Sequence, residues 1–380
     1  MSKPRLLILS FSHFENDARV LKQLRLFSED YEVITCGYGG TPEGIREHYQ
    51  VPDEAGYWLY PRVPIMLRQY SRAYWGNPAV SAALELLRGV DFDIVLANDI
   101  DSVGLALRLR PRLGVHADLH EYSPRQKEEL RRWRWFFAPF VRWMCKKFVT
   151  RADSVTTVGE GIAREYRDRF GIAAETVTNA SPYQDLEPTE VGSEIRLVHS
   201  GIAARERQLE ILIEAATSTT APVGLDLFLM PVDRAYLAEL EALAAASGGR
   251  VRVRPPVPNA ELVRTLNGYD VGLHVLPPTS FNNAWALPNK FFDYVQARLG
   301  LIIGPSPEMQ RILEREGFGA VSADFGVAGL TAELERLTPE LVRSWKRAST
   351  GAARRLSADV QVQGWKRPID ALAARDGGGA

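Results

Sequence analysis

The segment ALPNKFFDYVQA, residues 286–297, places a proline, an asparagine and a lysine at the start of an expected helix. The free N–H groups of a first helical turn carry partial positive charge, so a lysine there is unfavourable unless an anion is bound. Lys290 and Asp293 are three residues apart and share one helix face. An ammonium on a diphosphate, beside a carboxylate that accepts two ribose hydroxyls, would suit a nucleoside diphosphate. A solvated lysine without a ligand also fits the pattern.

More cations follow an expected strand in the segment HSGIAARERQLEILIEAA. Gly201 lets a ligand approach the backbone, and Arg205 and Arg207 lie in the next loop or first helical turn. Together with Asn289, these residues complete the expected anion-binding set around Lys290. Gly201 is also compatible with nothing more than a tight turn.

Polar side chains also follow the expected strands in the first half of the chain. They belong to His13, Asn16, Asp17, Arg19, Asn98, Asp99, His120 and Glu121. Such groups bind hydroxyls and move protons, so we expect them to bind a second substrate. His120 also suits a structural role, and Asp17 with Arg19 suits a helix N-terminal carboxylate with a surface partner.

Two series of strands and helices must position these side chains. Short runs rich in Val, Ile and Leu alternate with helical patterns, which predicts parallel sheets covered on both faces. In the first half the expected strands are 5–10, 31–36, 93–98, 115–120, 154–159 and 175–180. In the second half they are 195–201, 225–230, 250–255, 270–276 and 299–304. The fold class is therefore α/β, with two Rossmann-like doubly wound domains and a ligand-binding cleft between them.

Composition and missing motifs exclude several classes of protein. The first strand lacks a following G-x-G-x-x-G and the chain lacks a phosphate-loop motif, which disfavours dinucleotide enzymes and nucleoside triphosphatases. Lys plus Arg number 46 against 47 Asp plus Glu, which disfavours nucleic acid. Cys36 and Cys145 have no zinc spacing. Without a signal peptide or a long apolar run, we expect a cytoplasmic protein.

Several segments resemble the retaining glycosyltransferases of the GT-B fold, most closely family 4. The resemblance spans nearly the whole chain and is carried by NDARVLKQLRLFSEDYEVITC, DIVLANDIDSVGLAL, DLHEYSP, ADSVTTVGEGIAREYRDRFGI, GYDVGLHVLPP and LPNKFFDYVQARLGLIIG. It implies transfer of a sugar from a UDP- or GDP-sugar to a glycan or lipid-linked acceptor, without a metal or other cofactor. It also implies an acceptor-binding domain at 1–185, a nucleotide-sugar domain at 186–355, and at 356–380 a helix returning to the first domain plus a disordered tail.

The resemblance also implies roles for individual residues. Gly201, Arg207 and Lys290 would face the diphosphate, Asp293 stands where the family has a ribose-binding glutamate, and His120 where it has a histidine near the reacting sugar. Two positions depart from the pattern: Trp285 lies near the position of the family's first glutamate, and Ile202 follows the glycine where an arginine is frequent.

With retention, the leaving phosphate takes the acceptor's proton and His120 orients the sugar. With inversion, a carboxylate such as Glu121, Asp99 or Asp17 is needed as a general base.

Rival functions fit parts of the sequence. Asp91-Phe-Asp93 and Asp99-Ile-Asp101 match the D-x-D pattern that binds Mn²⁺ in a single-sheet class of glycosyltransferase. That class would leave the second series of strands without a role, so we predict no metal site. A nucleotide-sugar 2-epimerase on the same fold is a second rival, and a noncatalytic sugar-nucleotide or membrane-binding protein is a third.

The segment 125–151 combines basic and aromatic side chains, among them Trp133, Trp135, Phe136 and Trp143. One interpretation is a pair of amphipathic helices with a solvated basic face. The other is a surface that binds an anionic membrane, with aromatics at headgroup depth and cations on phosphates. This second interpretation places the protein peripherally on the inner face of the cell membrane and suits a lipid-linked acceptor.

Overall fold

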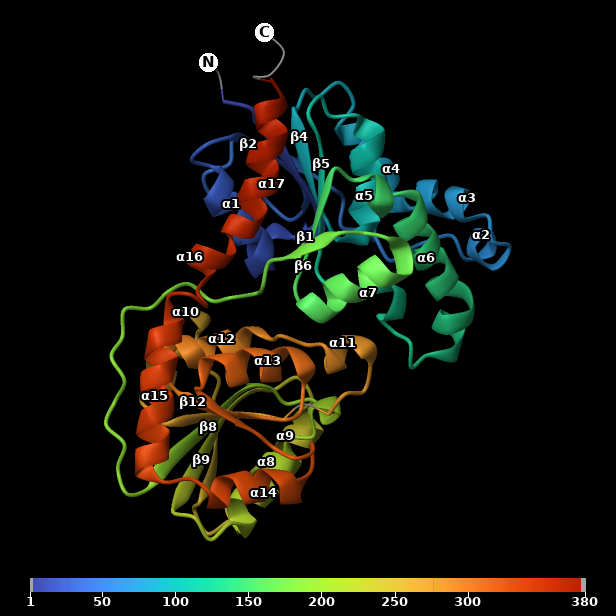
Figure 1. The fold of residues 1–380 in the computed structure, drawn as a ribbon. Coiled ribbons are helices and arrows are strands. Elements are labelled where there is room, and N and C mark those ends of the chain that lie inside the picture. The colour runs from blue at the N-terminus through green and yellow to red at the C-terminus, as the bar shows by residue number, and fades with distance from the viewer. Residues whose placement is uncertain (1–2, 276, 377–380) are drawn as a thin grey trace. The chain divides into compact units, whose positions relative to one another are not determined.

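The computed structural model describes residues 3–275 and 277–376, and the chain divides into two compact units (Figure 1). The first unit comprises the chain up to Thr178, Ser280–Asn282 and the chain from Val362 onward; the second comprises Asn179–Thr279 and Asn283–Gln361. The divisions at 178 and 361 compare with the expected boundaries at 185 and 355. The cleft expected between the units stays a prediction. Residues 377–380 of the expected disordered tail lie outside the described residues.

The first unit is built on a seven-stranded parallel sheet. In spatial order its strands are β3 (Glu47–Gln50), β2 (Glu32–Tyr38), β1 (Arg5–His13), β4 (Ile94–Asn98), β5 (Gly114–Leu119), β6 (Ser154–Thr157) and β7 (Ala174–Thr176). The strand order reverses between β1 and β4, so the carboxyl ends of these two strands and of β5 form the ligand-binding edge of a doubly wound sheet.

The second unit repeats this arrangement with six parallel strands. In spatial order they are β10 (Val251–Arg254), β9 (Val223–Met230), β8 (Ile195–Ile202), β11 (Val271–His274), β12 (Gly300–Ile303) and β13 (Gly319–Val321). Here the order reverses between β8 and β11. The predicted fold class, two doubly wound parallel-sheet domains, is confirmed.

Helices cover both sheets (Figure 1). In the first unit they are α1 (Ala18–Phe27), α2 (Arg62–Met66), α3 (Tyr70–Trp75), α4 (Pro78–Leu86), α5 (Asp99–Leu109), α6 (Ala138–Lys147), α7 (Glu160–Phe170) and α17 (Gln363–Ala373), with short turns η1 (Phe14–Asn16), η2 (Ser123–Arg125), the π-helical η3 (Trp133–Phe137), η4 (Val149–Arg151) and η6 (Ala374–Asp376). In the second they are η5 (Arg205–Arg207), α8 (Glu210–Ser218), α9 (Arg234–Ala246), α10 (Asn259–Leu266), α12 (Asn289–Gln296), α13 (Pro307–Glu316), α14 (Val327–Glu335), α15 (Pro339–Ala353) and α16 (Ala358–Gln361). Helix α11 (Phe281–Ala284) begins in the first unit.

The burial of the central strands explains why the sequence pattern predicted them. All five residues of β4 are buried, as are all four of β11 and of β12, because helices cover both faces of each sheet. The pattern missed β3 and β13, which have four and three residues at sheet edges. Such short, half-buried strands carry too few apolar positions to show a period.

The last helix of the chain, α17, completes the first unit. Trp365, Ile369 and Leu372 are buried in the same hydrophobic cluster as Leu6 and Ile8 of β1. Figure 1 shows this red helix beside the blue α1. The end of the sequence therefore forms part of the core around its beginning.

Candidate functional site

In the second unit, the end of β8 meets the start of α12. Pro288 precedes α12 in an extended conformation, which ends the loop and leaves Lys290 in the first helical turn. A Cβ atom placed on Gly201 would lie 2.7 Å from Lys290 Nζ. The ammonium thus occupies the space that a side chain at position 201 would fill, and the fold brings together two residues that the sequence predicted for one site.

The charge at this point is mainly positive. Burial and, after it, the charge of Arg207 lower the pKa of Lys290 to about 8, whereas Asp293 acts in the opposite direction. Ser181 Oγ donates to Asp293 Oδ1 at 2.5 Å. A lowered lysine pKa means that the protonated form lacks full electrostatic compensation, and an anion would supply it.

Two histidines that the sequence interpretation did not select lie at the same place. His199 Nδ1 is 2.9 Å from the Leu273 carbonyl oxygen, and burial followed by the charge of Lys290 lowers its pKa to about 3. The rings of His274 and His199 are nearly parallel, with their centroids 6.4 Å apart. Burial holds the pKa of His274 well below its usual range. Both imidazoles are therefore neutral, and the cations here are Lys290 and Arg207. The signal for His199 was its place in a strand end, HSG, beside Gly201.

Two other predicted residues are placed differently. Arg205 donates to Glu239 through Nη1 at 2.9 Å and Nη2 at 2.5 Å, and its guanidinium lies over the Tyr236 ring. Asn289, the first residue of α12, is exposed. The structure thus brings Gly201, Arg207, Lys290 and Asp293 together and engages Arg205 with a surface carboxylate.

In the first unit, His120 lies where β4 and β5 end. His120 Nδ1 is 3.3 Å from Asp99 Oδ2, and His120 Nε2 is 3.2 Å from Asn98 Oδ1. The backbone N–H of His120 also donates to Asp99 Oδ1 at 3.3 Å. Asp99 has a φ of 61°, a left-handed conformation that is strained for a residue other than glycine. This strained turn at the start of α5 points the carboxylate at the imidazole.

A buried ion pair lies next to His120. Arg19 donates to Asp118 through Nε at 2.8 Å and Nη2 at 2.7 Å, and Gln23 and Thr156 each donate to Asp118 at 2.7 Å. Although burial opposes ionisation, Arg19 and these donors hold the pKa of the Asp118 carboxyl well below its usual range. Arg19, expected at the acceptor, is therefore buried in the structure, and Asn98 is buried in an amide pair with Gln23.

The remaining predicted residues of this unit lie at the edge of the group. Asp17 accepts from the backbone N–H groups of Arg19 and Val20, so it caps α1, as its structural interpretation predicted. His13 and Asn16 are exposed at the end of β1 and in η1. The sequence pattern alone did not separate these surface positions from the buried ones.

A pocket of about 510 Å³, the acid pocket, opens beside His120. Its acidic lining consists of Asp99, Asp101 and Glu121, and its aromatic lining of Tyr57, Trp58, Tyr60, Trp133, Phe137 and Phe140. Burial raises the pKa of Asp101 to about 6, while burial and the charge of Asp99 raise the pKa of Glu121 to about 7. Glu121 can therefore accept or release a proton near neutral pH. The aromatic residues 57–60 were missed because they lie in a loop without periodicity.

Known proteins resemble the chain in sequence and in fold. Residues 20–180 match the family described as Glycosyltransferase Family 4. No curated protein sequence matches the chain. The Anabaena protein Alr3699/HepE, solved in complex with UDP, is similar over 97% of this chain and 100% of its own, with a TM-score of 0.70 and 12% identity. At this identity the likeness shows the fold, which is that of GT-B enzymes.

Two further solved structures give the same result. The sucrose-phosphate synthase of Thermosynechococcus elongatus has a TM-score of 0.70 and 13% identity over 98% of this chain and 100% of its own. The lipopolysaccharide outer core galactosyltransferase WaaB, in its apo form, has a TM-score of 0.66 and 13% identity over 97% and 99%. The chain therefore has the GT-B fold, and residues 20–180 of its first unit match Glycosyltransferase Family 4.

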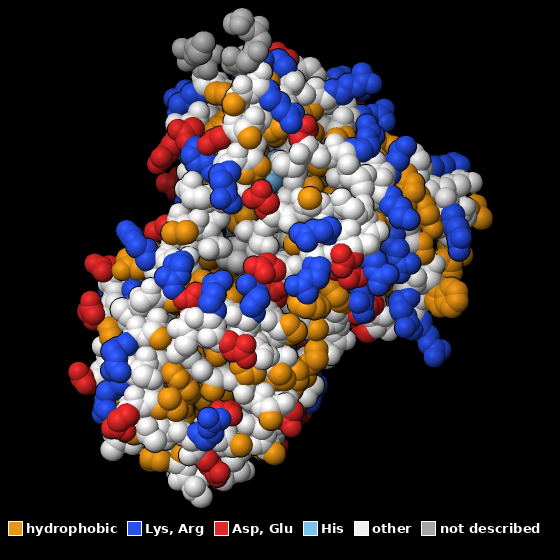
Figure 2. All heavy atoms as spheres, viewed as in Figure 1, with side chains coloured by type: hydrophobic (Ala, Val, Ile, Leu, Met, Phe, Trp, Pro, Cys, Tyr) orange, Lys and Arg blue, Asp and Glu red, His pale blue; other side chains and the backbone are white. Residues whose placement is uncertain are grey.

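The basic and aromatic segment of the first unit contributes to both its core and its surface. Phe140 is buried in the first unit, whereas Trp135 and Phe136 of η3 are 75% and 41% exposed. Helix α2, which the sequence interpretation did not select, contacts η3 and adds the exposed Val63 and Met66. Figure 2 shows hydrophobic and basic side chains gathered on the side of the first unit that carries α2 and α6 in Figure 1.

Two features are absent from the described part of the chain. Within residues 3–275 and 277–376, no group of three or more His, Cys, Asp or Glu side chains is arranged to hold a metal ion. None of the helices in these ranges has the length and apolar character that a bilayer-spanning segment needs.

Proposed function

We propose that this protein is a glycosyltransferase that takes its sugar from a nucleoside diphosphate sugar, with the diphosphate bound at Lys290. The observation that carries the proposal is the ammonium of Lys290 seated on Gly201, with Arg207 as a second cation and a pKa lowered to about 8. Two cations at the carboxyl end of a parallel strand suit an anionic ligand. The UDP complex of Alr3699/HepE, a protein of the same fold, supports a nucleotide as the anion.

The cations serve the chemistry by stabilising the leaving group. As the bond between sugar and diphosphate breaks, negative charge develops on the phosphate oxygens, and preorganised donors stabilise this charge more than that of the bound substrate. Lys290 and Arg207 supply this stabilisation without a metal ion. Activity that persists in EDTA is the corresponding expectation, and loss of activity that Mn²⁺ restores would contradict it.

The acid pocket of the first unit is proposed to hold the acceptor. With retention, the leaving phosphate takes the proton of the acceptor hydroxyl, and His120, oriented by Asp99, positions the reacting sugar. With inversion, Glu121 is the best-placed general base, because its raised pKa matches neutral pH. The anomeric configuration of the first-formed product, read by proton NMR, separates the two.

The acceptor is proposed to be lipid-linked, and the protein to bind an anionic membrane through residues 125–151. The exposed aromatics of η3 and the exposed apolar residues of α2 can enter a headgroup layer, while neighbouring basic side chains contact lipid phosphates. The resemblance in fold to WaaB, a lipopolysaccharide outer core galactosyltransferase, agrees with such an acceptor.

The first experiment is a panel of nucleoside diphosphates in thermal unfolding, since a ligand that binds only the folded state raises the melting temperature. UDP or GDP should raise it for the native protein and much less for Lys290→Ala. Removing one such oxyanion donor costs about 3 kcal/mol, so Lys290→Ala should transfer sugar roughly a hundredfold more slowly. Lys290→Arg is the matched control that keeps the charge.

Product analysis then distinguishes the functions. Nucleotide release with a glycosylated acceptor supports transfer. An epimerised sugar would indicate an isomerase, and binding without turnover would indicate a noncatalytic protein.

A further inference from the structure

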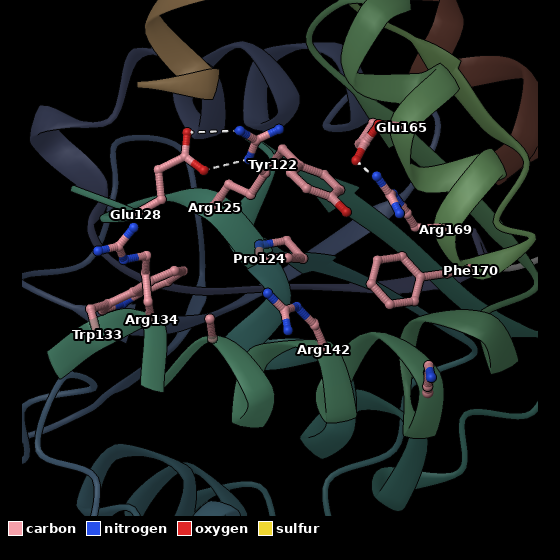
Figure 3. A pocket seen from close by; sticks show the side chains of 12 residues that line it. Tyr122, Pro124, Arg125, Glu128, Trp133, Arg134, Arg142, Glu165, Arg169 and Phe170 are labelled. Carbon is pink, nitrogen blue, oxygen red and sulfur yellow. Dashed lines mark hydrogen bonds and ion pairs between the residues drawn. The ribbon is translucent and has the colours of Figure 1, made fainter. Parts of the chain in front are cut away.

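A second cavity of about 520 Å³ in the first unit has the opposite charge to the acid pocket. Its lining comes from η2, η3, α6 and α7 (Figure 3). The charged residues of the lining are Arg125, Glu128, Arg134, Arg142, Lys146, Glu165 and Arg169. Five cations therefore face two carboxylates.

The two carboxylates are already engaged. Arg125 donates to Glu128 through Nε at 2.5 Å and Nη2 at 3.1 Å, and Arg169 donates to Glu165 at 3.1 Å. Figure 3 shows both pairs at the far side of the cavity from α6. Among the described residues, Arg134, Arg142 and Lys146 have no carboxylate partner.

The unpaired cations converge on one cavity. Arg142 and Lys146 are four residues apart on α6, so their like charges share one helix face and repel each other. In Figure 3 the Arg142 guanidinium extends from α6 toward Pro124. A bound anion would remove this repulsion.

The cavity also has an apolar part and is separate from the acid pocket. Trp133, Pro124, Ala138 and Phe170 supply the apolar part of its lining. The loop 121–126 separates this cavity from the acid pocket, because Tyr122, Pro124 and Arg125 line one and Glu121, Ser123 and Gln126 line the other. The two cavities therefore select groups of opposite charge on either side of one loop.

We propose that this basic cavity binds a phosphate-bearing group. Arginine forks match phosphate oxygens, and one phosphate can accept hydrogen bonds from several cations at once. The cavity lies in the first unit and Lys290 in the second, so this inference does not rest on the proposed donor site. The phosphate belongs either to a soluble phosphate ester or to a phospholipid headgroup.

Two matched variants test the cavity. Arg142→Gln/Lys146→Gln removes two charges from its lining, while Arg164→Gln/Arg167→Gln removes two charges from exposed positions of α7 that lie outside the lining and outside residues 125–151. All four side chains are exposed, so both variants should keep the native melting temperature, which is measured first.

The probes are inorganic pyrophosphate, titrated calorimetrically in the presence of saturating UDP, and vesicles of phosphatidylglycerol in phosphatidylcholine, tested by flotation. We expect the cavity variant to bind one of these probes at least tenfold more weakly than the native protein, and the control variant to change by less than twofold. Loss for pyrophosphate identifies a soluble ester, and loss for vesicles alone identifies a headgroup.

Equal weakening in both variants would show diffuse attraction by the surface cations of the first unit and overturn the inference. Binding that neither variant changes, or no binding of either probe by the native protein, would overturn it as well. A failure of UDP to bind would instead count against the donor site, because the contrast between the two variants is independent of UDP.

Discussion

Lys290 and Gly201 work as a pair, since the space of a missing side chain at one position is filled by the ammonium of the other. The lysine carries the charge and the glycine fixes where that charge lies. Binding of an anion here should therefore depend both on the protonation of the lysine and on the space left by the glycine.

The affinity for UDP should depend on pH through Lys290. Its pKa is about 8 in the free protein against an ordinary value of 10.5, so the ammonium is present at pH 7 and is lost above pH 8. A bound anion favours the protonated form, so the affinity should fall by up to about tenfold for each pH unit above 8. Titration calorimetry from pH 7 to 9.5 measures this.

Lys290→Arg should flatten that pH profile, because arginine stays protonated. The stability of the ligand-free protein should change in the opposite sense. The unfolded chain holds the proton between pH 8 and 10.5 and the folded chain does not, so Lys290 makes folding more favourable as pH rises through this window. A binding profile that is identical for the native protein and for Lys290→Arg would remove the lysine from the site.

Gly201→Ala should weaken UDP binding with little loss of stability. The new Cβ would lie 2.7 Å from Lys290 Nζ, and the end of a flexible side chain can move away at small cost. The displaced ammonium should lower UDP affinity by about tenfold or more, the value of a charge-assisted hydrogen bond. Gly351→Ala is the control, because no atom lies within 4 Å of its added Cβ.

At the scale of elements, α17 supports the site of the first unit although it is the last helix of the chain. The Arg19 guanidinium lies 4.6 Å from the centre of the Trp365 ring and holds Asp118, which lies 3.8 Å from His120 Nε2. A helix near the C-terminus is thus linked to His120 through the buried side chains of Arg19 and Asp118.

Trp365→Ala should destabilise the first unit strongly. Trp365 is 1% exposed, and truncating a buried tryptophan costs about 3–5 kcal/mol. Urea unfolding followed by circular dichroism measures the loss, with the two units allowed separate transitions. Trp135→Ala, at an exposed position, should stay within about 0.5 kcal/mol of the native protein. Equal losses in the two variants would mean that α17 contributes no core.

At the scale of the whole molecule, the candidate sites of the two units differ in charge. The second unit presents cations at a strand end, and the first presents an acid pocket, a basic cavity and an exposed apolar surface. If the apolar surface binds a membrane, removing its apolar side chains should weaken membrane binding even when all the charges are kept.

Trp135→Ser/Phe136→Ser should weaken binding to phosphatidylglycerol vesicles by about tenfold or more, since each large apolar side chain that becomes buried contributes about 1.5–3 kcal/mol. Met230→Ser/Val232→Ser removes two exposed apolar side chains from the second unit and should leave binding unchanged. Cosedimentation gives both affinities. Equal effects, or none, would contradict a membrane contact through η3.

Local sequence determined most of the architecture. Runs such as DIVLAN and LGLIIG are buried on both faces, so their composition alone predicts strands. Proline restricts the backbone at its own position, so Pro288 in the sequence already predicted that a helix starts next to Lys290. Only the tertiary structure showed that Arg207 acts on Lys290 whereas Arg205 binds Glu239. It also showed that Arg19 is buried and binds Asp118 near His120. Which carboxylate a cation meets depends on residues distant in the chain, here 34 and 99 positions away, and no local pattern encodes that distance.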